Sequence, residues 1–276
     1  MNVKDKFNLK DNLAVITGGA GLLGTQHTEA LLEVECSVIV LDINTQALAQ
    51  LEEECFAKYG KKILTLKVDI TKESEILQAK ETIYNHFKKF PNILINNAAI
   101  DPKFEKESKI NKSRLENFDL IQWNLELSVG LSAAMLCSKI FGYEMAKNKK
   151  GVILNIASDL GVIAPNQNLY KQDALQDAQQ NVKPVTYSVI KHGLIGLTKY
   201  IATYWADKGV RCNAFAPGGV YNNHPQEFVD KVSELIPMSR MAEVDEYKAS
   251  IVFLCSDASS YMNGATLNMD GGRSTW

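Results

Sequence analysis

The sequence lacks the features that mark secreted, membrane-spanning or nucleic-acid-binding proteins. Its five cysteines are dispersed, odd in number and form no C-x-x-C pattern, so they predict thiols in a reducing compartment. The net charge of -2 gives no support for a nucleic-acid or membrane surface. No apolar run approaches the ~18 residues of a membrane span, and residues 1–6 lack the apolar core of a signal peptide. We therefore expect a cytoplasmic protein without nucleic-acid or membrane partners.

Metal-ligand spacing is also lacking. The four histidines are scattered along the chain, and none forms a recognisable ligand pair with a neighbouring cysteine or carboxylate. We expect no bound metal. These histidines are His27, His86, His192 and His224.

Short apolar runs alternate with helical patterns from the N-terminal end almost to the last residues. This alternation predicts an α/β fold with a doubly wound, seven-stranded parallel sheet and helices on both faces. The 276 residues suit one domain, 1–276, with no composition break. The expected strands are 13–17, 37–41, 63–68, 93–96, 152–157, 211–215 and 265–269, and the expected helices are 22–34, 45–59, 72–88, 113–147 with a break, 186–207 and 243–256.

Two segments look irregular: 159–184, rich in Asn, Gln and Asp, and 217–240, which begins Pro-Gly-Gly. Irregular segments this long inside a compact domain tend to be functional lids or disordered. We interpret the first as an active-site insert and the second as a substrate lid.

A glycine-rich turn, Thr17 to Gly24, joins the first strand to the first helix. Glycines at 18, 21 and 24 let the backbone approach a pyrophosphate, which the helix N-terminus stabilises. The turn therefore predicts a dinucleotide site of Rossmann type, formed by Gly18, Gly21, Leu22, Leu23 and Gly24.

Asp42 ends the second strand, where a carboxylate accepts hydrogen bonds from the adenosine ribose hydroxyls and repels a 2′-phosphate. No Arg or Lys follows it closely, so we expect NAD rather than NADP. The alternative is that Asp42 only caps the next helix.

Two further strand ends are candidates for cofactor contact. Asp69 and Ile70 are positioned to meet adenine, although N-capping of the helix from Thr71 is an equal alternative. The small residues of Asn97, Ala98 and Ala99 let the backbone pass beside the cofactor, or else pack a strand end closely.

Tyr187 and Lys191 lie one helical turn apart, so the ammonium can approach the phenol oxygen. An opposite charge favours the phenolate, and bringing a phenol from pKa ~10 to near 7 requires roughly 4 kcal/mol. Such a tyrosine suits general acid/base work in a C–OH/C=O interconversion. Taken alone, the pair more often decorates a solvated helix.

The chain resembles the single-domain short-chain dehydrogenases/reductases over almost its full length. The resemblance rests on the glycine turn, Asp69, the Asn-Asn-Ala stretch, Asn124, Ser158, Tyr187/Lys191, Pro217-Gly218 and Asp270-Gly271-Gly272. It implies that Tyr187 is the acid/base, Ser158 a donor to the substrate oxygen and Asn124 the holder of a relay water. Lys191 would lower the pKa of Tyr187 and hydrogen-bond the nicotinamide ribose, so Tyr187 and Lys191 are also expected to contact the cofactor. The resemblance also implies cofactor contacts from Pro217, Gly218 and Val220, and a homotetramer or homodimer that pairs helices 125–147 and 186–207.

Three departures qualify this resemblance. The T-G-x-x-G-x-x-G spacing is similar to that of nucleotide-sugar epimerases and dehydratases, but only 85 residues follow Lys191, too few for their second domain. Ala99 stands where the family usually has glycine. Ser158 and Tyr187 lie 29 positions apart, a longer separation than is usual in the family.

The surplus lies in 166–181, directly after the serine, and so borders the active-site mouth. Its neutral amides and one aromatic side chain suit a polyhydroxylated ligand; a solvated excursion or an oligomer contact is the alternative. The expected substrate residues are Asp159, Asn166, Tyr170, Lys171, Tyr221 and Asn222, and Lys171 or Lys183 would meet a phosphate. The polar insert and lid argue against a steroid or fatty-acyl substrate.

The insert and the stretch 217–223 also resemble the flagellin-modification oxidoreductases of bacterial nonulosonate-sugar pathways. We therefore expect an NAD-dependent oxidoreductase of a secondary alcohol or ketone on a sugar or sugar phosphate. An epimerase or dehydratase that recycles its NAD, and a non-catalytic dinucleotide-binding scaffold, remain as alternatives.

Overall fold

The computed structural model describes residues 2–100, 111–172 and 175–276. A seven-stranded, all-parallel sheet in the order β3-β2-β1-β4-β5-β6-β7 forms its centre. The predicted fold class is confirmed, and each predicted strand differs from the observed one by at most two residues at either end. The strands are β1 Leu13–Thr17, β2 Ser37–Asp42, β3 Ile63–Lys67, β4 Ile93–Asn96, β5 Gly151–Ile156, β6 Val210–Pro217 and β7 Thr266–Met269.

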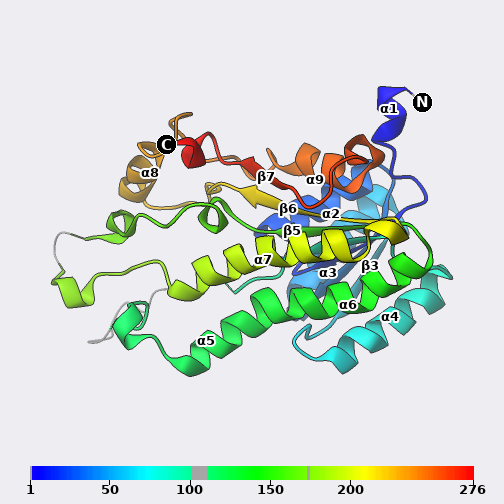
Figure 1. Cartoon of the computed structure of the whole chain (residues 1–276), viewed down its shortest axis with the longest axis horizontal. Coiled ribbons are helices and arrows are strands. Elements are labelled where there is room, and N and C mark those ends of the chain that lie inside the picture. Colours follow the sequence, from blue (N-terminus) through cyan, green and yellow to red (C-terminus); the bar gives the residue numbers. More distant parts are fainter. Residues whose placement is uncertain (1, 101–110, 173–174) are drawn as a thin grey trace.

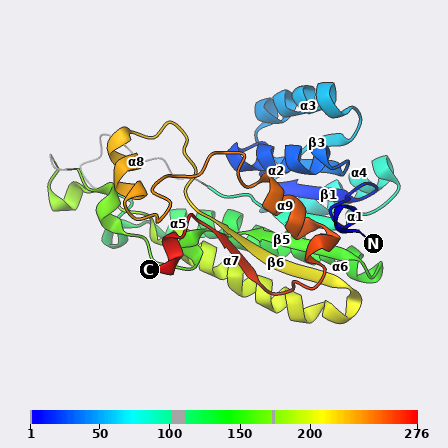
Figure 2. The ribbon, with the colours of Figure 1, turned by 90° about the horizontal axis from the view of Figure 1, so that it is seen from above.

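The central strands are uniformly apolar because helices cover both faces of the sheet. Every residue of β1 and β4 is buried. Two hydrophobic clusters divide the core: one lies between the sheet and α2, α3 and α9, and the other between the sheet and α4, α6 and α7. Figures 1 and 2 show these two helical layers with the sheet between them.

The helices have the bounds α1 Val3–Lys6, α2 Leu22–Glu33, α3 Thr45–Tyr59, α4 Glu73–Phe87, α5 Leu120–Leu127, α6 Ala133–Lys147, α7 Val185–Tyr204, α8 Gln226–Ser233 and α9 Lys248–Cys255. Neither α1 nor α8 was predicted. The expected helix 243–256 is shorter, because Arg240 and Glu246 form a bidentate ion pair that closes a turn ahead of α9.

The predicted break in helix 113–147 is a π turn, Ser128–Ser132, between α5 and α6. At its centre Gly130 packs against α7, where an added Cβ would lie 2.8 Å from Ile190 Cγ2. Among the described residues, the stretch Leu120–Lys147 is the one helix whose length and composition would suit a membrane span. Half of that apolar window is buried inside the fold, and α6 packs on β4 and β5, so a core helix accounts for it.

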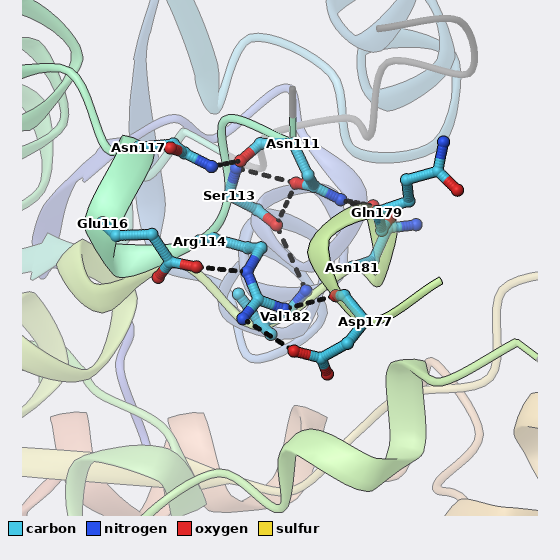
Figure 3. A network of polar contacts seen from close by, with 9 residues as sticks. All are labelled: Asn111, Ser113, Arg114, Glu116, Asn117, Asp177, Gln179, Asn181 and Val182. Atoms are coloured by element: carbon cyan, nitrogen blue, oxygen red, sulfur yellow. Dashed lines mark hydrogen bonds and ion pairs between the residues drawn. The ribbon is translucent and has the colours of Figure 1, made fainter. Parts of the chain in front are cut away.

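The insert folds back onto its own chain. Arg114 Nη1 donates to Asp177 O at 2.7 Å, Asn111 Nδ2 to Asn181 Oδ1 at 2.8 Å, and Val182 N to Ser113 Oγ at 3.1 Å. Figure 3 shows this network joining residues 111–117 to residues 177–182. The insert is therefore held by the segment that leads into α5, and its described residues form three single 3₁₀ turns, Asp159–Gly161, Gln167–Tyr170 and Asp177–Gln179.

Candidate active site

A cavity of about 930 Å³ lies at the carboxyl ends of the strands and runs from the glycine turn to the insert. This is where open parallel sheets bind ligands. It is lined by all of the predicted cofactor residues, by Ser158, Tyr187 and Lys191, and by three predicted substrate residues, Asp159, Tyr170 and Asn222. The cofactor residues are Gly18, Gly21, Leu22, Leu23, Gly24, Asp42, Asp69, Ile70, Asn97, Ala98, Ala99, Pro217, Gly218 and Val220.

The glycine turn is built so that backbone packs on backbone. Gly18 has φ +61°, and an added Cβ would lie 2.8 Å from Ala98 Cα. A Cβ on Gly24 would lie 2.7 Å from Gly19 Cα. Gly21 is the N-cap of α2, without a side-chain cap, and its nearest neighbour would be 3.4 Å away. The first N–H groups of α2 are thus left for a ligand, as a phosphate cradle requires.

The Asp42 carboxylate is fixed by two backbone donors, Ala20 N–H at 3.2 Å and Asn44 N–H at 3.0 Å. It is not the N-cap of α3, because Asn44 occupies that position and accepts from Ala47 N. The carboxylate therefore bridges the glycine turn and the end of β2, at the edge of the cavity.

Asp69 accepts hydrogen bonds from the backbone N–H and hydroxyl of Thr71. These bonds, with the nearby Lys72, lower the pKa of the Asp69 carboxyl. Asn97 Nδ2 donates to Thr17 O at 3.1 Å and to Gly18 O at 2.9 Å, so it ties the end of β4 to the glycine turn. Both strand ends are thus held rigidly beside the cavity.

The catalytic candidates meet at the end of β5. Lys191 is buried, its Nζ donates to Ile156 O at 2.8 Å, and it lies 5.7 Å from the Tyr187 ring centroid. Burial, and next the charge of Lys183, lower the pKa of Lys191 to about 8. The half-buried Tyr187 lines the same cavity as Ser158.

The sequence did not predict that Asp159, the residue after Ser158, pairs with Arg273. Ser158 Oγ donates to Asp159 Oδ1 at 2.7 Å, and Asp159 Oδ2 accepts from Arg273 Nη1 at 2.9 Å. The pair is buried, since the side chains of Arg273 and Asp159 are 9% and 4% exposed. The only signal was that a charged residue directly after a buried strand needs a partner. Nothing local pointed to Arg273, 114 positions away.

Four predicted residues do not line the cavity. Asn124 is exposed on α5, whose cavity-lining residue is Leu125, and its role as the holder of a relay water stays a prediction. Asn166 and Lys171 are exposed on the insert, where Asn166 caps a 3₁₀ turn. Tyr221 is exposed on the lid.

The substrate end has a more apolar wall than the amide-rich sequence led us to expect. Tyr170 of the insert packs on Phe228 of α8, with ring centroids 5.9 Å apart. The two side chains pack against a small hydrophobic cluster between the insert and α8. The expectation that these segments present no apolar side chains is therefore wrong, because the insert and lid turn theirs inward: Leu169, Tyr170, Phe228, Val232 and Met241 line the cavity.

Comparison with known proteins identifies the family. Residues 12–171 match the short chain dehydrogenase family, and residues 173–274 match the family described as enoyl-(acyl carrier protein) reductase. A 3β-hydroxysteroid dehydrogenase 2 of Eggerthella lenta is 30% identical, over 97% of this chain and 96% of the relative. A galactitol 2-dehydrogenase of Rhizobium johnstonii is 30% identical over the full length of both chains. The post-translational flagellin modification protein A of Campylobacter coli is 26% identical, over 96% of this chain and 98% of the relative.

Two solved structures with bound nucleotides are similar over nearly the whole chain. A short chain dehydrogenase from Leptospira borgpetersenii with bound NAD⁺ has a TM-score of 0.77 and 28% identity, covering 99% of this chain and 96% of that one. A gluconate 5-dehydrogenase from Burkholderia cenocepacia in complex with NADP and tartrate has a TM-score of 0.84 and 24% identity, covering both chains fully. Both nucleotides thus occur among similar folds.

Proposed function

The chain belongs to the short-chain dehydrogenase/reductase family of oxidoreductases, and on that premise we propose that it interconverts a secondary alcohol and a ketone on a sugar-like molecule with NAD. The observation that carries the proposal is one cavity shared by the glycine turn, Ser158, Tyr187 and Lys191. Such a constellation brings a proton donor to the substrate oxygen beside a dinucleotide.

Each residue has a defined task in this proposal. Tyr187 takes the hydroxyl proton when the alcohol is oxidised and returns it when the ketone is reduced. The Lys191 ammonium favours the phenolate, and Ser158, whose hydroxyl donates to Asp159 in the free chain, would turn that hydrogen to the same substrate oxygen. A nicotinamide held in the cavity would supply or accept the hydride at carbon, so proton and hydride together balance the reaction.

The residues at the other end of the cavity suit a dinucleotide. Gly21 leaves the N-terminus of α2 open for the pyrophosphate, and any larger residue would fill that space. The Asp42 carboxylate, held by Ala20 and Asn44, suits the ribose hydroxyls and repels a 2′-phosphate. We therefore propose NAD as the cofactor. In a test, Asp42→Ala should lower the preference for NADH over NADPH at least tenfold; a native enzyme that prefers NADPH would contradict the proposal.

Support for a sugar-like substrate comes from the polar groups that share the cavity lining with the apolar side chains: Asp159, Lys183, Asn222, His224 and Arg273. Aromatic and polar side chains in one cavity suit a sugar ring, which has an apolar face and polar edges. The galactitol and flagellin-modification relatives agree with this choice. The apolar wall itself supports a second candidate, a hydrophobic alicyclic alcohol such as a sterol. The two candidate substrates are separated by a screen in which NADH absorbance at 340 nm is followed. The screen includes keto and hydroxy sugars, sugar acids, sugar phosphates and hydroxysteroids.

The acid/base assignment is tested by Tyr187→Phe. We expect turnover to fall at least ~1,000-fold, within the range that general acid/base catalysis contributes, with NAD affinity unchanged within a factor of three. Unchanged turnover would rule out Tyr187 as the acid/base. Turnover of substrate without a net change in NADH absorbance at 340 nm would instead favour an epimerase or dehydratase that recycles its NAD.

The proposed homo-oligomer, in the cytoplasm, pairs α5, α6 and α7 with the same helices of a second copy. Of the apolar residues predicted for that contact, Leu131, Leu194 and Leu197 pack within the core of this chain, whereas Met135 is exposed. Other exposed apolar residues on these helices are Leu120, Ile121, Tyr143, Tyr200 and Tyr204. Light scattering should give two or four copies per particle, and Tyr200→Lys/Tyr204→Lys should reduce the number.

A further inference from the structure

Lys183, near the end of the insert, contacts the ring of Tyr187. It directly precedes Pro184, the N-cap of α7, and a residue before proline is restricted to extended backbone. The side chain of Gln167 holds its backbone from both sides: Lys183 N donates to Gln167 Oε1 at 2.8 Å, and Gln167 Nε2 donates to Lys183 O at 3.4 Å. The insert therefore fixes where this lysine begins.

From that position the Lys183 ammonium lies over the face of the Tyr187 ring, with Nζ 3.9 Å from the ring centroid. Lys191 Nζ is farther from the same centroid, at 5.7 Å. A cation within about 6 Å of an aromatic face is attracted by the ring's electrons. The attraction grows when the phenol ionises, because the negative charge is shared with the ring.

We propose that Lys183 is a second cation serving Tyr187, a positioning residue that stabilises the phenolate through the ring face while Lys191 does so from its own helix. This inference rests on the proposed acid/base role of Tyr187. The insert is then part of the catalytic apparatus, since it delivers a charge to the tyrosine as well as enclosing the substrate.

The surrounding charges agree with this role. Across the cavity Asp159 and Arg273 form an ion pair and together carry no net charge. On α5, Glu126 accepts a hydrogen bond from Thr186 and is buried there, and His224 lies at the lid. Among the described residues, Lys183 and Lys191 are the cations near the Tyr187 ring, at 3.9 and 5.7 Å from its centroid, and a phenolate between them reduces their mutual repulsion. Burial, and next the charge of Lys183, lower the pKa of Lys191, which agrees with that repulsion.

The first experiment needs no substrate. The ionisation of Tyr187 is followed by tyrosinate absorbance near 295 nm, as the difference between each protein and its Tyr187→Phe counterpart, with and without NAD. Lys183→Met keeps the length of the side chain and removes its charge. We expect the midpoint of the Tyr187 titration to rise by about 0.5 to 1.5 pH units in Lys183→Met. Lys183→Arg, which keeps the charge, should stay within ~0.3 units of wild type.

Two further variants test whether the effect depends on where the Lys183 charge is held or on the total charge of the protein. Gln167→Ala releases the backbone of Lys183 and should give a smaller rise than Lys183→Met. Lys199→Met removes an exposed lysine from the same helix, α7, and should leave the midpoint unchanged. A midpoint in Lys183→Met within ~0.2 units of wild type would overturn the inference.

Kinetics distinguish this role from simple substrate binding. In the oxidation direction, Lys183→Met should move the rising limb of the kcat/KM pH profile to higher pH, with an approximately tenfold loss below the midpoint and a similar plateau above it. A raised KM at every pH with an unmoved midpoint would assign Lys183 to substrate binding and overturn the inference. If Tyr187→Phe retains turnover, the proposed function itself fails, whatever Lys183→Met does.

Discussion

The two ends of the cavity are built in different ways. At the nucleotide end, short segments of backbone pack on one another: Gly18 against Ala98, and Gly24 against Gly19. At the substrate end, side chains from distant segments hold the insert, as Arg114 does with Asp177. The nucleotide end depends on glycines at fixed positions. The substrate end depends on pairs of side chains that are distant in sequence and meet only in the folded chain. A change at the nucleotide end should therefore damage fold and cofactor binding together, whereas a change at the substrate end should alter substrate use and leave NAD binding intact.

The largest combined effect, on stability and on cofactor binding together, is expected at Gly24. A Cβ there would meet backbone atoms, which cannot move aside as a side-chain end can. Gly24→Ala should destabilise the protein by roughly 3 kcal/mol and weaken NAD binding more than about a hundredfold. Urea unfolding and NAD titration measure both.

Two other glycines provide the matched controls. Gly21→Ala, with its nearest neighbour at 3.4 Å, should keep stability within roughly 1 kcal/mol while NAD affinity falls about tenfold. Gly196→Ala, with no atom within 4 Å in α7, should raise stability by roughly 0.5–1 kcal/mol. Equal NAD affinity in Gly21→Ala and wild type would argue against the pyrophosphate cradle.

The buried ion pair at the substrate end comes next. Arg273→Met leaves the Asp159 carboxylate buried and unpaired, which typically costs about 3–5 kcal/mol. The double variant Asp159→Asn/Arg273→Met should recover most of that loss in thermal unfolding. If the double variant is no more stable than Arg273→Met alone, the two side chains do not act as a pair.

Arg114, which holds the insert, provides the most direct test of the contrast between the two ends of the cavity. Arg114→Ala removes the bonds to Asp177 O and its carboxylate, and the exposed ion pair itself contributes only ~0.5 kcal/mol. We expect KM for the proposed sugar-like substrate to rise about fivefold, with NAD affinity unchanged. A parallel loss of NAD affinity would mean that the two ends of the cavity are coupled.

The last prediction concerns a buried histidine in the helix that follows the glycine turn, and its effect appears only at low pH. His27 of α2 is fully buried, and neither ring nitrogen bonds to any described residue. Burial lowers its pKa to about 3, so between pH 6.5 and about 3 the unfolded chain binds a proton that the folded chain excludes. Stability should therefore fall as pH drops below 6.5, by about 2 kcal/mol at pH 5. His27→Leu should remove that part of the pH dependence, measured by urea unfolding at pH 7 and pH 5.

Much of the fold could be predicted because its signals are local. The buried strands are continuous apolar runs, and the glycine turn lies where a strand meets a helix. Helix α8 was missed because eight mostly polar residues between prolines look like a loop, and its apolar side packs in a cluster with the distant Leu169 and Tyr170 of the insert.

The site residues divide in the same way. Ser158, Tyr187 and Lys191 belong to recognisable patterns, and the fold brings them to one cavity. Arg273 could not be predicted, because its partner Asp159 is distant in sequence. The sequence does not show which face of α5 meets the cavity: in the structure Leu125 lines it and Asn124 is exposed.

That π turn has a consequence for how chain length varies. A π turn holds one residue more than the α-helical ladder requires, so loss of one residue between Ser128 and Ser132 could be absorbed as regular helix. The helix on either side would keep its orientation, because the wider π turn takes up its extra residue by turning less per residue, so Leu125 would stay at the cavity and Glu126 beside Thr186. A single-codon deletion here would thus shorten the chain while leaving the substrate wall, the sheet and the nucleotide site in place.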